Sequence, residues 1–437
     1  MRRILFPLMF VVCCLQWQPA FAQFGLNFSG VGPVNRSMGG VATATPIDSL
    51  GAIHWNPATI AALPSSEMSF GVDGVLPVVD ITSSLGPFAG GDDSDGGWFA
   101  APLFGVVQQV DDSEWTYGLG IMTVAGFGQN FPASSATGTT NPVLFPGDGL
   151  AENGGIPGFG NIFAEAAFIE IAPVLALQVT ENLSIGFGPT VTIGRVQASP
   201  FAFAPPDNAN AIGFPTFPDG TNARYHWGGG FQMGAYLETD QCVNFGVSYK
   251  SPQWFENFTA NSTDEIGRTR NLNFSLDLPQ IVSFGASYTG MQNVLLGVDV
   301  RHIGWSHADL FGDPASFSNG ALRGLGWDST WNVSVGGQYL LSERLTVRAG
   351  YAYGPSPIDG NPESGLNVGT PLILEHILSA GTSVRISDAL SMHVAYTYAI
   401  ENELNGPIQG PAGPVGGSTL SQQVSAHFLT AGFTAAF

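Results

Sequence analysis

The chain is dominated by strand-length segments in which large apolar residues alternate with small or polar ones. In Leu183–Gly188, Leu, Ile and Phe fall on one face and Ser and Gly on the other, and Trp331–Gly336 repeats the pattern. A period of two is that of a β-strand, whose successive side chains point to opposite faces. The pattern therefore predicts an all-β chain in which the two faces of each strand meet different surroundings.

Two kinds of connection join these segments in alternation, one short and polar and the other long and rich in Gly and Pro. This asymmetry is typical of transmembrane antiparallel β-barrels, with turns in the periplasm and loops outside. The short turns are 111–114, 180–182, 239–241, 290–292, 342–343 and 387–388. The long loops are 82–97, 128–162, 198–226, 306–326, 355–371 and 402–421, with a shorter one at 256–272.

Composition supports a barrel and excludes other classes. Of all residues 44% are hydrophobic and only 11% are charged, whereas soluble domains have about 25% charged residues. The net charge of -21 and the presence of a single lysine, Lys250, exclude a nucleic-acid binder, which needs a basic face. After residue 22 no apolar run reaches the roughly 18 residues of a spanning helix. A sheet in lipid must then close on itself, because lipid offers no hydrogen-bond partners.

We expect about fourteen barrel strands within residues 67–437. An even number places both ends of the barrel on one side, as in single-chain bacterial barrels. The strands are predicted to begin near Glu67, Trp98, Trp115, Phe163, Leu183, Trp227, Val243, Phe274, Val294, Trp331, Arg344, Ile373, Leu390 and Gln423.

The last strand has the clearest pattern. Leu429, Phe433 and Phe437 share one face, and Phe428 and Thr430 share the other. A strand that ends the chain on an aromatic residue resembles the C-terminal signal read by the bacterial barrel-insertion machinery. Aromatic residues near other strand ends fit the interfacial girdles of such barrels, where they would meet outer-membrane lipid and lipopolysaccharide. The expected location is the outer membrane of a Gram-negative bacterium.

Residues 1–22 have the pattern of a secretory signal peptide. Arg2 and Arg3 precede a short apolar core, and Ala20-Phe21-Ala22 forms a small-x-small cleavage site. Removal of this segment leaves Cys242 as the only cysteine, so no disulfide within the chain is expected.

Residues 23–66 do not read as a barrel strand. They are rich in small residues, as suits a compact plug (hatch) inside a lumen, and they contain Asn56-Pro57-Ala58. This segment resembles the hatch of the FadL/TodX family of outer-membrane transporters for long-chain fatty acids and other hydrophobic compounds. Stretches at 278–288, 336–339 and 345–353 are similar to family strands. The resemblance extends from the hatch to Phe437.

The resemblance implies a monomeric barrel that passively transports a hydrophobic small molecule. Ligand would move from the outer loops to an apolar pocket and leave sideways, through a gap beside a kinked third strand, when the hatch moves. By position, Phe24 matches a ligand-contacting tail residue, Asn56, Pro57 and Ala58 match the hatch triplet, and Gly126, Phe127 and Gly128 match the kink. A structural turn is the better interpretation for Asn56, while an ordinary strand end fits Gly126–Gly128 equally well.

A carboxylate ligand would need a cationic partner in an apolar pocket. Arg195, at the outer end of the predicted fifth strand, matches a family position that holds an Arg, and Arg323 lies near another. The alternative is that each pairs with a carboxylate of the chain or with lipopolysaccharide phosphate. If both have such roles, a neutral hydrocarbon becomes the better ligand.

Other functions have weaker support in the sequence. A barrel of this kind could instead dock or shuttle secreted proteins, and the hatch disfavours a general diffusion porin. The acidic loop Asp92-Asp93-Ser94-Asp95 could bind Ca²⁺, but it lacks EF-hand spacing and reads better as a solvated loop. No catalytic constellation has supporting context, so we expect neither an enzyme nor a cofactor or metal site.

Overall fold

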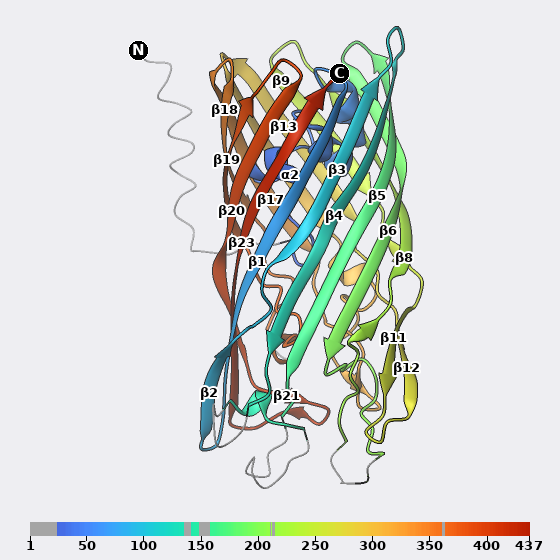
Figure 1. Ribbon diagram of the computed structural model, residues 1–437, viewed down its shortest axis with the longest axis vertical. Helices are drawn as coiled ribbons and strands as arrows, with labels where there is room; N and C mark the ends of the chain where they lie inside the picture. Colours follow the sequence, from blue (N-terminus) through green and yellow to red (C-terminus); the bar gives the residue numbers. More distant parts are fainter. Residues whose placement is uncertain (1–23, 135–140, 148–157, 210, 212–214, 361–362) are drawn as a thin grey trace.

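The computed structural model describes residues 24–134, 141–147, 158–209, 211, 215–360 and 363–437, so the predicted signal peptide lies outside the described residues. Its main feature is a closed antiparallel barrel of tilted strands (Figure 1). Fourteen strands form the wall: β1 (Glu67–Leu85), β3 (Phe99–Gln109), β4 (Trp115–Phe131), β5 (Ile162–Thr180), β6 (Leu183–Ser199), β8 (His226–Leu237), β9 (Val243–Lys250), β13 (Ile281–Met291), β14 (Val294–Ile303), β17 (Thr330–Ser342), β18 (Leu345–Tyr353), β19 (His376–Arg385), β20 (Leu390–Gly406) and β23 (Ser418–Ala436).

Each wall strand pairs with its neighbours in sequence, and the ladder between the first and last strands closes the ring. β1 pairs with β23 over its whole length, from Glu67↔Ala436 to Leu85↔Ser418, and β8 pairs with β9. The predicted count of fourteen is confirmed. One predicted start is wrong, because Phe274 ends a short strand outside the wall and the eighth wall strand begins at Ile281.

The long loops carry short elements of their own at one end of the barrel (Figure 1). β2 (Phe88–Asp93) folds back on β1, and β10 (Trp254–Phe255) extends β8. β7 (Asn222–Ala223), β11 (Phe258–Thr263) and β12 (Thr269–Phe274) form a small separate sheet. In the described parts of the loops, the remaining pieces are two hairpins and three helical turns: β15 (Phe317–Ser318) with β16 (Ala321–Leu322), β21 (Gln409–Gly410) with β22 (Gly413–Pro414), η2 (Pro142–Leu144), η4 (Trp305–His307) and α4 (Glu363–Leu366).

The wall has an apolar outside and a small or polar inside. On β23, Leu429 is 62% exposed whereas Thr430 is fully buried, which confirms the faces predicted for this strand. The same alternation leaves large apolar side chains such as Phe187 and Trp331 exposed on other strands. In water such a surface would be unfavourable, but against lipid it is the expected outer face of a barrel.

The N-terminal segment (residues 24–66) lies inside the barrel, as Figure 1 shows for α2. It contains α2 (Gly32–Ser37), α3 (Ser49–Trp55) and the 3₁₀ helix η1 (Pro57–Ala62). Asp48 caps α3 by accepting from the Gly51 N–H at 3.1 Å, and Asn56 caps η1 by accepting from the Ala58 N–H at 3.1 Å. Within the described residues, no helix is long and apolar enough to cross a membrane.

Candidate ligand-binding site

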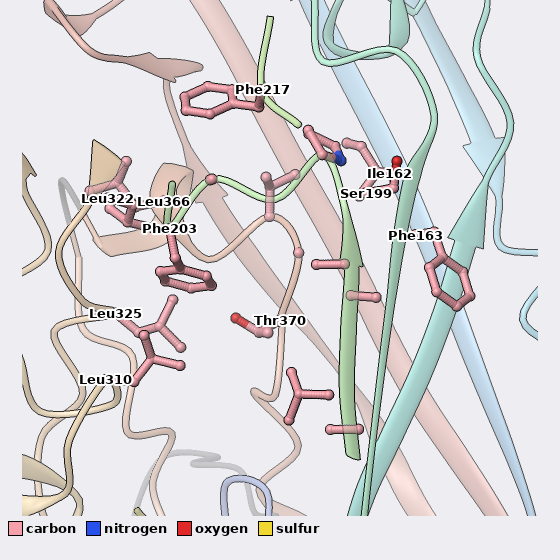
Figure 2. A pocket seen from close by; sticks show the side chains of 18 of the residues that line it. Ile162, Phe163, Ser199, Phe203, Phe217, Leu310, Leu322, Leu325, Leu366 and Thr370 are labelled. Carbon is pink, nitrogen blue, oxygen red and sulfur yellow. The ribbon is translucent and has the colours of Figure 1, made fainter. Parts of the chain in front are cut away.

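An apolar cavity of about 100 Å³ lies where the outer ends of β5 and β6 meet the loops; we call it the inner cavity. The wall strands contribute Ile162 and Ser199, and the loops contribute Phe203, Leu310 and Leu325, which Figure 2 shows gathered opposite the strand ends. Sequence-distant loops therefore converge on one site. The cavity also touches the N-terminal segment at Leu26.

The lining of the inner cavity has few polar groups. Among the described residues that line it, none is charged, and the polar side chains are those of Gln197, Ser199, Thr370 and Gln409. Thr370 donates to the Asn367 side chain at 3.3 Å. An apolar site with a few polar groups is typical of pockets for small hydrophobic ligands.

A larger outer cavity of about 620 Å³ adjoins the inner cavity on the loop side. The two share Phe159, Pro200, Phe217 and Gln409 in their linings. The outer and inner cavities are therefore neighbours.

A third cavity, of about 40 Å³, lies on the other side of Phe127, which lines both it and the inner cavity; we call it the portal cavity. Its lining includes Phe28 of the N-terminal segment, Phe99 of β3 and Phe428 of β23. Gln129 is its only polar side chain among the described lining residues.

The portal cavity lies beside an interruption in the barrel wall. The β3–β4 ladder ends at the pair Leu103↔Met122. Beyond it, β1 is the only wall strand that pairs with residues 99–102 of β3, and β5 is the only wall strand that pairs with β4 from Thr123 onward. Pro102 stands at this point, and proline has no N–H to donate to a ladder. The β4–β5 register also shifts between Thr123 and Ala125, a bulge that bends the strand.

The N-terminal segment pairs with β4 where β3 no longer does. The Phe28 N–H donates to the Val124 carbonyl at 3.0 Å, and the Gly126 N–H donates to the Leu26 carbonyl at 3.4 Å. Asn27 and Ala125 form an antiparallel bridge between these two bonds. The bend of β4 and the position of the segment are thus coupled by backbone hydrogen bonds.

Two buried ion pairs help to hold the N-terminal segment. The guanidinium of Arg36 donates to Asp73 of β1 at 2.6 Å and lies between the rings of Phe28 and Phe428. Asp299 of β14 accepts the backbone N–H groups of residues 42 and 43 and pairs with Arg301 at 2.5 Å.

A third buried pair joins two wall strands to the segment. Lys250 of β9 donates to the Glu170 carboxylate at 2.8 Å and to Nδ1 of His54 at 3.1 Å. Burial, together with the positive charge of Lys250, lowers the pKa of His54 to about 4. His54 is therefore neutral at pH 7 and serves as an acceptor for Lys250.

The predicted N-terminal residues lie at different distances from the cavities. Phe24 is fully buried but lines neither the inner nor the portal cavity; Leu26 does reach the inner cavity. Asn56 donates to the carbonyls of Thr43 and Ala235 at 2.7 and 3.0 Å. With Pro57 and Ala58 it forms the turn between α3 and η1, away from the linings of both cavities.

The two predicted arginines also lie away from the cavities. Arg195 pairs in register with Ala167, contacts Glu165 at 3.4 Å and stacks on Tyr225. Arg323 is an exposed loop residue. Gly126, Phe127 and Gly128, predicted at the kink, line the portal cavity, and Phe127 also lines the inner one.

Most of the lining was not predicted from the sequence. Leu310, Leu325 and Leu366 come from loops that are distant along the chain. Leu26 lies two residues from Phe24, which the sequence did predict as a ligand contact. No cluster of metal-ligating side chains occurs in the part of the chain that the structure describes.

A closed fourteen-stranded barrel with an apolar outer face, and with apolar cavities beneath its loops, defines an outer-membrane transport barrel. The family model described as "Outer membrane protein transport protein (OMPP1/FadL/TodX)" matches residues 12–141 and 164–437, and the chain belongs to this family. The resemblance found in the sequence is thereby confirmed. The chain is an outer-membrane protein of a Gram-negative bacterium, in a family of transporters rather than enzymes.

Similar proteins and structures cover nearly the whole chain. Long-chain fatty acid transport proteins from Shigella flexneri and Escherichia coli O157:H7 are each 23% identical to it, over 87% of this chain and 88% of each relative. The P. putida toluene transporter TodX has a TM-score of 0.70 at 15% identity, over 94% of this chain and 99% of TodX. A Pseudomonas aeruginosa FadL homologue has a TM-score of 0.67 at 17% identity, over 94% of this chain and all of the homologue.

Proposed function

We propose that this protein transports hydrophobic molecules passively across the outer membrane and releases them sideways into the bilayer. The relatives named for long-chain fatty acids and for toluene point to this class of ligand. The observation that carries the proposal is the series of apolar cavities from the loops to the interrupted β3–β4 ladder. The alternative role in protein secretion gains no support from the family match.

This route suits the physics of an apolar ligand. Such a molecule gains free energy on leaving water for an apolar surrounding, so it needs no energy source to move from the loops to the cavities and into lipid. Sideways release avoids the water-filled periplasm, where the molecule would have to be solvated again. The driving force is then the partition of the ligand itself.

We propose that residues 23–66 act as the hatch and that their pairing with β4 controls the portal. Leu26 lines the inner cavity and Phe28 lines the portal cavity, while Asn27 between them bridges to Ala125. A ligand that displaces Leu26 would strain this bridge. Because a ligand shifts a conformational equilibrium only through unequal affinity for its states, contact with Leu26 provides the required coupling.

A reversible lock tests this mechanism. Bridge partners lie close enough for a disulfide, so Asn27→Cys with Ala125→Cys, in a Cys242→Ser background, should tie the hatch to β4. In a deletion strain carrying the variant, we expect toluene uptake to fall at least about tenfold when the pair is oxidised. Reduction should restore it.

The single-cysteine variants, treated with the same oxidant, are the matched controls and should transport normally. Unchanged uptake by the oxidised double variant, with the disulfide verified by mass spectrometry, would contradict a moving hatch. Equal uptake by the deletion strain with and without the wild-type chain would contradict the transport function itself.

A further inference from the structure

We infer that the transport path selects compact, uncharged hydrophobic molecules and excludes carboxylates. This inference rests on the proposed function and concerns the substrate class of the same site. Its first support is the lining of the inner and portal cavities, where no described residue carries a charge. A carboxylate that entered either cavity would lose its water without gaining an ionic partner, which is strongly unfavourable.

The positions of the basic residues also leave a bound carboxylate without a cationic side chain in the inner or portal cavity. The sequence has 13 Lys and Arg, of which Arg2 and Arg3 precede the hatch. None of the other eleven lines the inner or portal cavity, and no histidine does. The two arginines that were predicted to bind a fatty-acid headgroup lie elsewhere: Arg195 pairs with Glu165, and Arg323 is exposed on a loop.

The buried cations inside the barrel already have partners. Arg36 pairs with Asp73, Arg301 with Asp299, and Lys250 with Glu170. Two cavities do border Lys250, but their volumes are about 10 and 20 Å³, the size of a single water molecule. No carboxylate with its hydrocarbon tail fits there.

The polar group in the portal cavity also opposes an anion. Gln129 donates its amide Nε2 to the Val368 carbonyl at 2.9 Å, which leaves its Oε1 buried without a partner. Oε1 is an acceptor, so it repels the oxygens of a carboxylate and tolerates an apolar or hydroxyl-bearing ligand.

The volume of the inner cavity indicates a compact ligand. At about 100 Å³ it is of the same order as the roughly 150 Å³ apolar cavity that binds benzene. Phe127 separates it from the portal cavity, so a long acyl chain would have to displace this ring before it could be accommodated. A single ring or a short chain needs no such displacement.

The test compares neutral and anionic probes of equal size on the full chain in nanodiscs at pH 7.5. Isothermal titration would measure binding of toluene against benzoate, and of 1-hexanol against hexanoate. We expect each neutral probe to bind at least about fivefold more tightly than its carboxylate. A smaller ratio, or tighter binding of the carboxylates, overturns the inference but leaves the proposed function intact. Failure of all four probes to bind overturns both.

A variant pair adds an independent measure. Val196 lines the inner cavity, and Val196→Lys would place a cation there, whereas Val196→Met adds similar length without charge. We expect Val196→Lys to bind benzoate at least about fivefold more tightly than Val196→Met does. Equal affinities in two folded variants would overturn the inference. If the lysine variant does not fold, the probe comparison on the wild-type chain decides alone.

Discussion

At the scale of single residues, the stability of the barrel depends strongly on the buried ion pair of Lys250. Lys250 is the only lysine of the chain, and it lies against Glu170 and His54 inside the barrel. Lys250→Met leaves the Glu170 carboxylate buried without a cation, which costs about 3–5 kcal/mol in comparable sites. We expect the free energy of unfolding, measured by denaturant titration in detergent micelles, to fall by about that amount.

The double variant Lys250→Met with Glu170→Gln is the control for this prediction. It removes both charges, so much of the lost stability should return, because the cost arises from an unpaired buried charge. If the double variant is as unstable as the sum of its two single variants, the pair does not interact in the way that its 2.8 Å separation indicates.

Phe127 belongs to the same scale, because one ring separates the inner cavity from the portal cavity. Phe127→Ala removes the ring and joins the two cavities, so we expect toluene uptake to rise about two- to tenfold in a strain that lacks the wild-type chain. Phe127→Trp enlarges the barrier and should lower uptake by a similar factor. Equal uptake by both variants would show that ligand does not pass this residue.

The residues predicted from the sequence to serve the ligand path differ in their position relative to the cavities. The triplet Gly126–Gly128 was predicted at a kink, and it lines the portal cavity. The arginines and Phe24 were predicted to contact ligand; they line neither the inner nor the portal cavity, and their ligand contact stays a prediction. A motif depends on local spacing, so it can be recognised in a single sequence. The residues that line a cavity depend on how distant loops converge, which a single sequence does not show.

At the scale of elements, we attribute the end of the β3–β4 ladder to the proline at position 102. Pro102 stands next to the last pair, Leu103↔Met122, and supplies no N–H. Pro102→Val restores a donor, so the ladder should extend toward Thr123 and narrow the gap. We expect toluene uptake to fall severalfold while the barrel remains folded.

Pro189→Val is the control, because Pro189 of β6 pairs with Phe231 of β8 and lies at a break in the β5–β6 ladder, away from the portal cavity. Its uptake should equal that of the wild type. Amide hydrogen exchange measured by mass spectrometry gives a second measure, since new pairing should protect the amides of residues 99–103 only in the Pro102 variant. Normal uptake despite this protection would argue against sideways release.

Most of the wall strands could be predicted from the sequence, because the period of two and the turn residues are local signals. The predicted start at Phe274 was wrong because Phe274, Leu276 and Leu278 alternate with polar residues like a strand, although Phe274 ends β12 of a small sheet and the wall strand begins at Ile281. An alternating segment looks the same in both settings, because the sequence pattern does not say which strand it will pair with.

At the scale of the whole molecule, the N-terminal segment (residues 24–66) fits inside the barrel because glycines on several wall strands leave room for its backbone. A Cβ at Gly246 of β9 would lie 1.9 Å from the Thr43 carbonyl oxygen, and a Cβ at Gly350 of β18 would lie 2.1 Å from the Gly39 nitrogen. The 58 glycines of the chain therefore include positions where no other residue would leave space for the hatch.

Gly246→Ala tests whether this close approach keeps the hatch in place. The added methyl would overlap backbone, which moves less easily than a side chain, while β9 keeps its ladders with β8 and β13. We therefore expect a folded barrel with a displaced hatch, seen as faster proteolysis of residues 24–66 and as new ion conductance in planar bilayers. Gly74→Ala is the control, because its Cβ would meet its nearest neighbour at an ordinary 3.5 Å. If Gly246→Ala conducts no more than Gly74→Ala, this close approach does not keep the N-terminal segment in place.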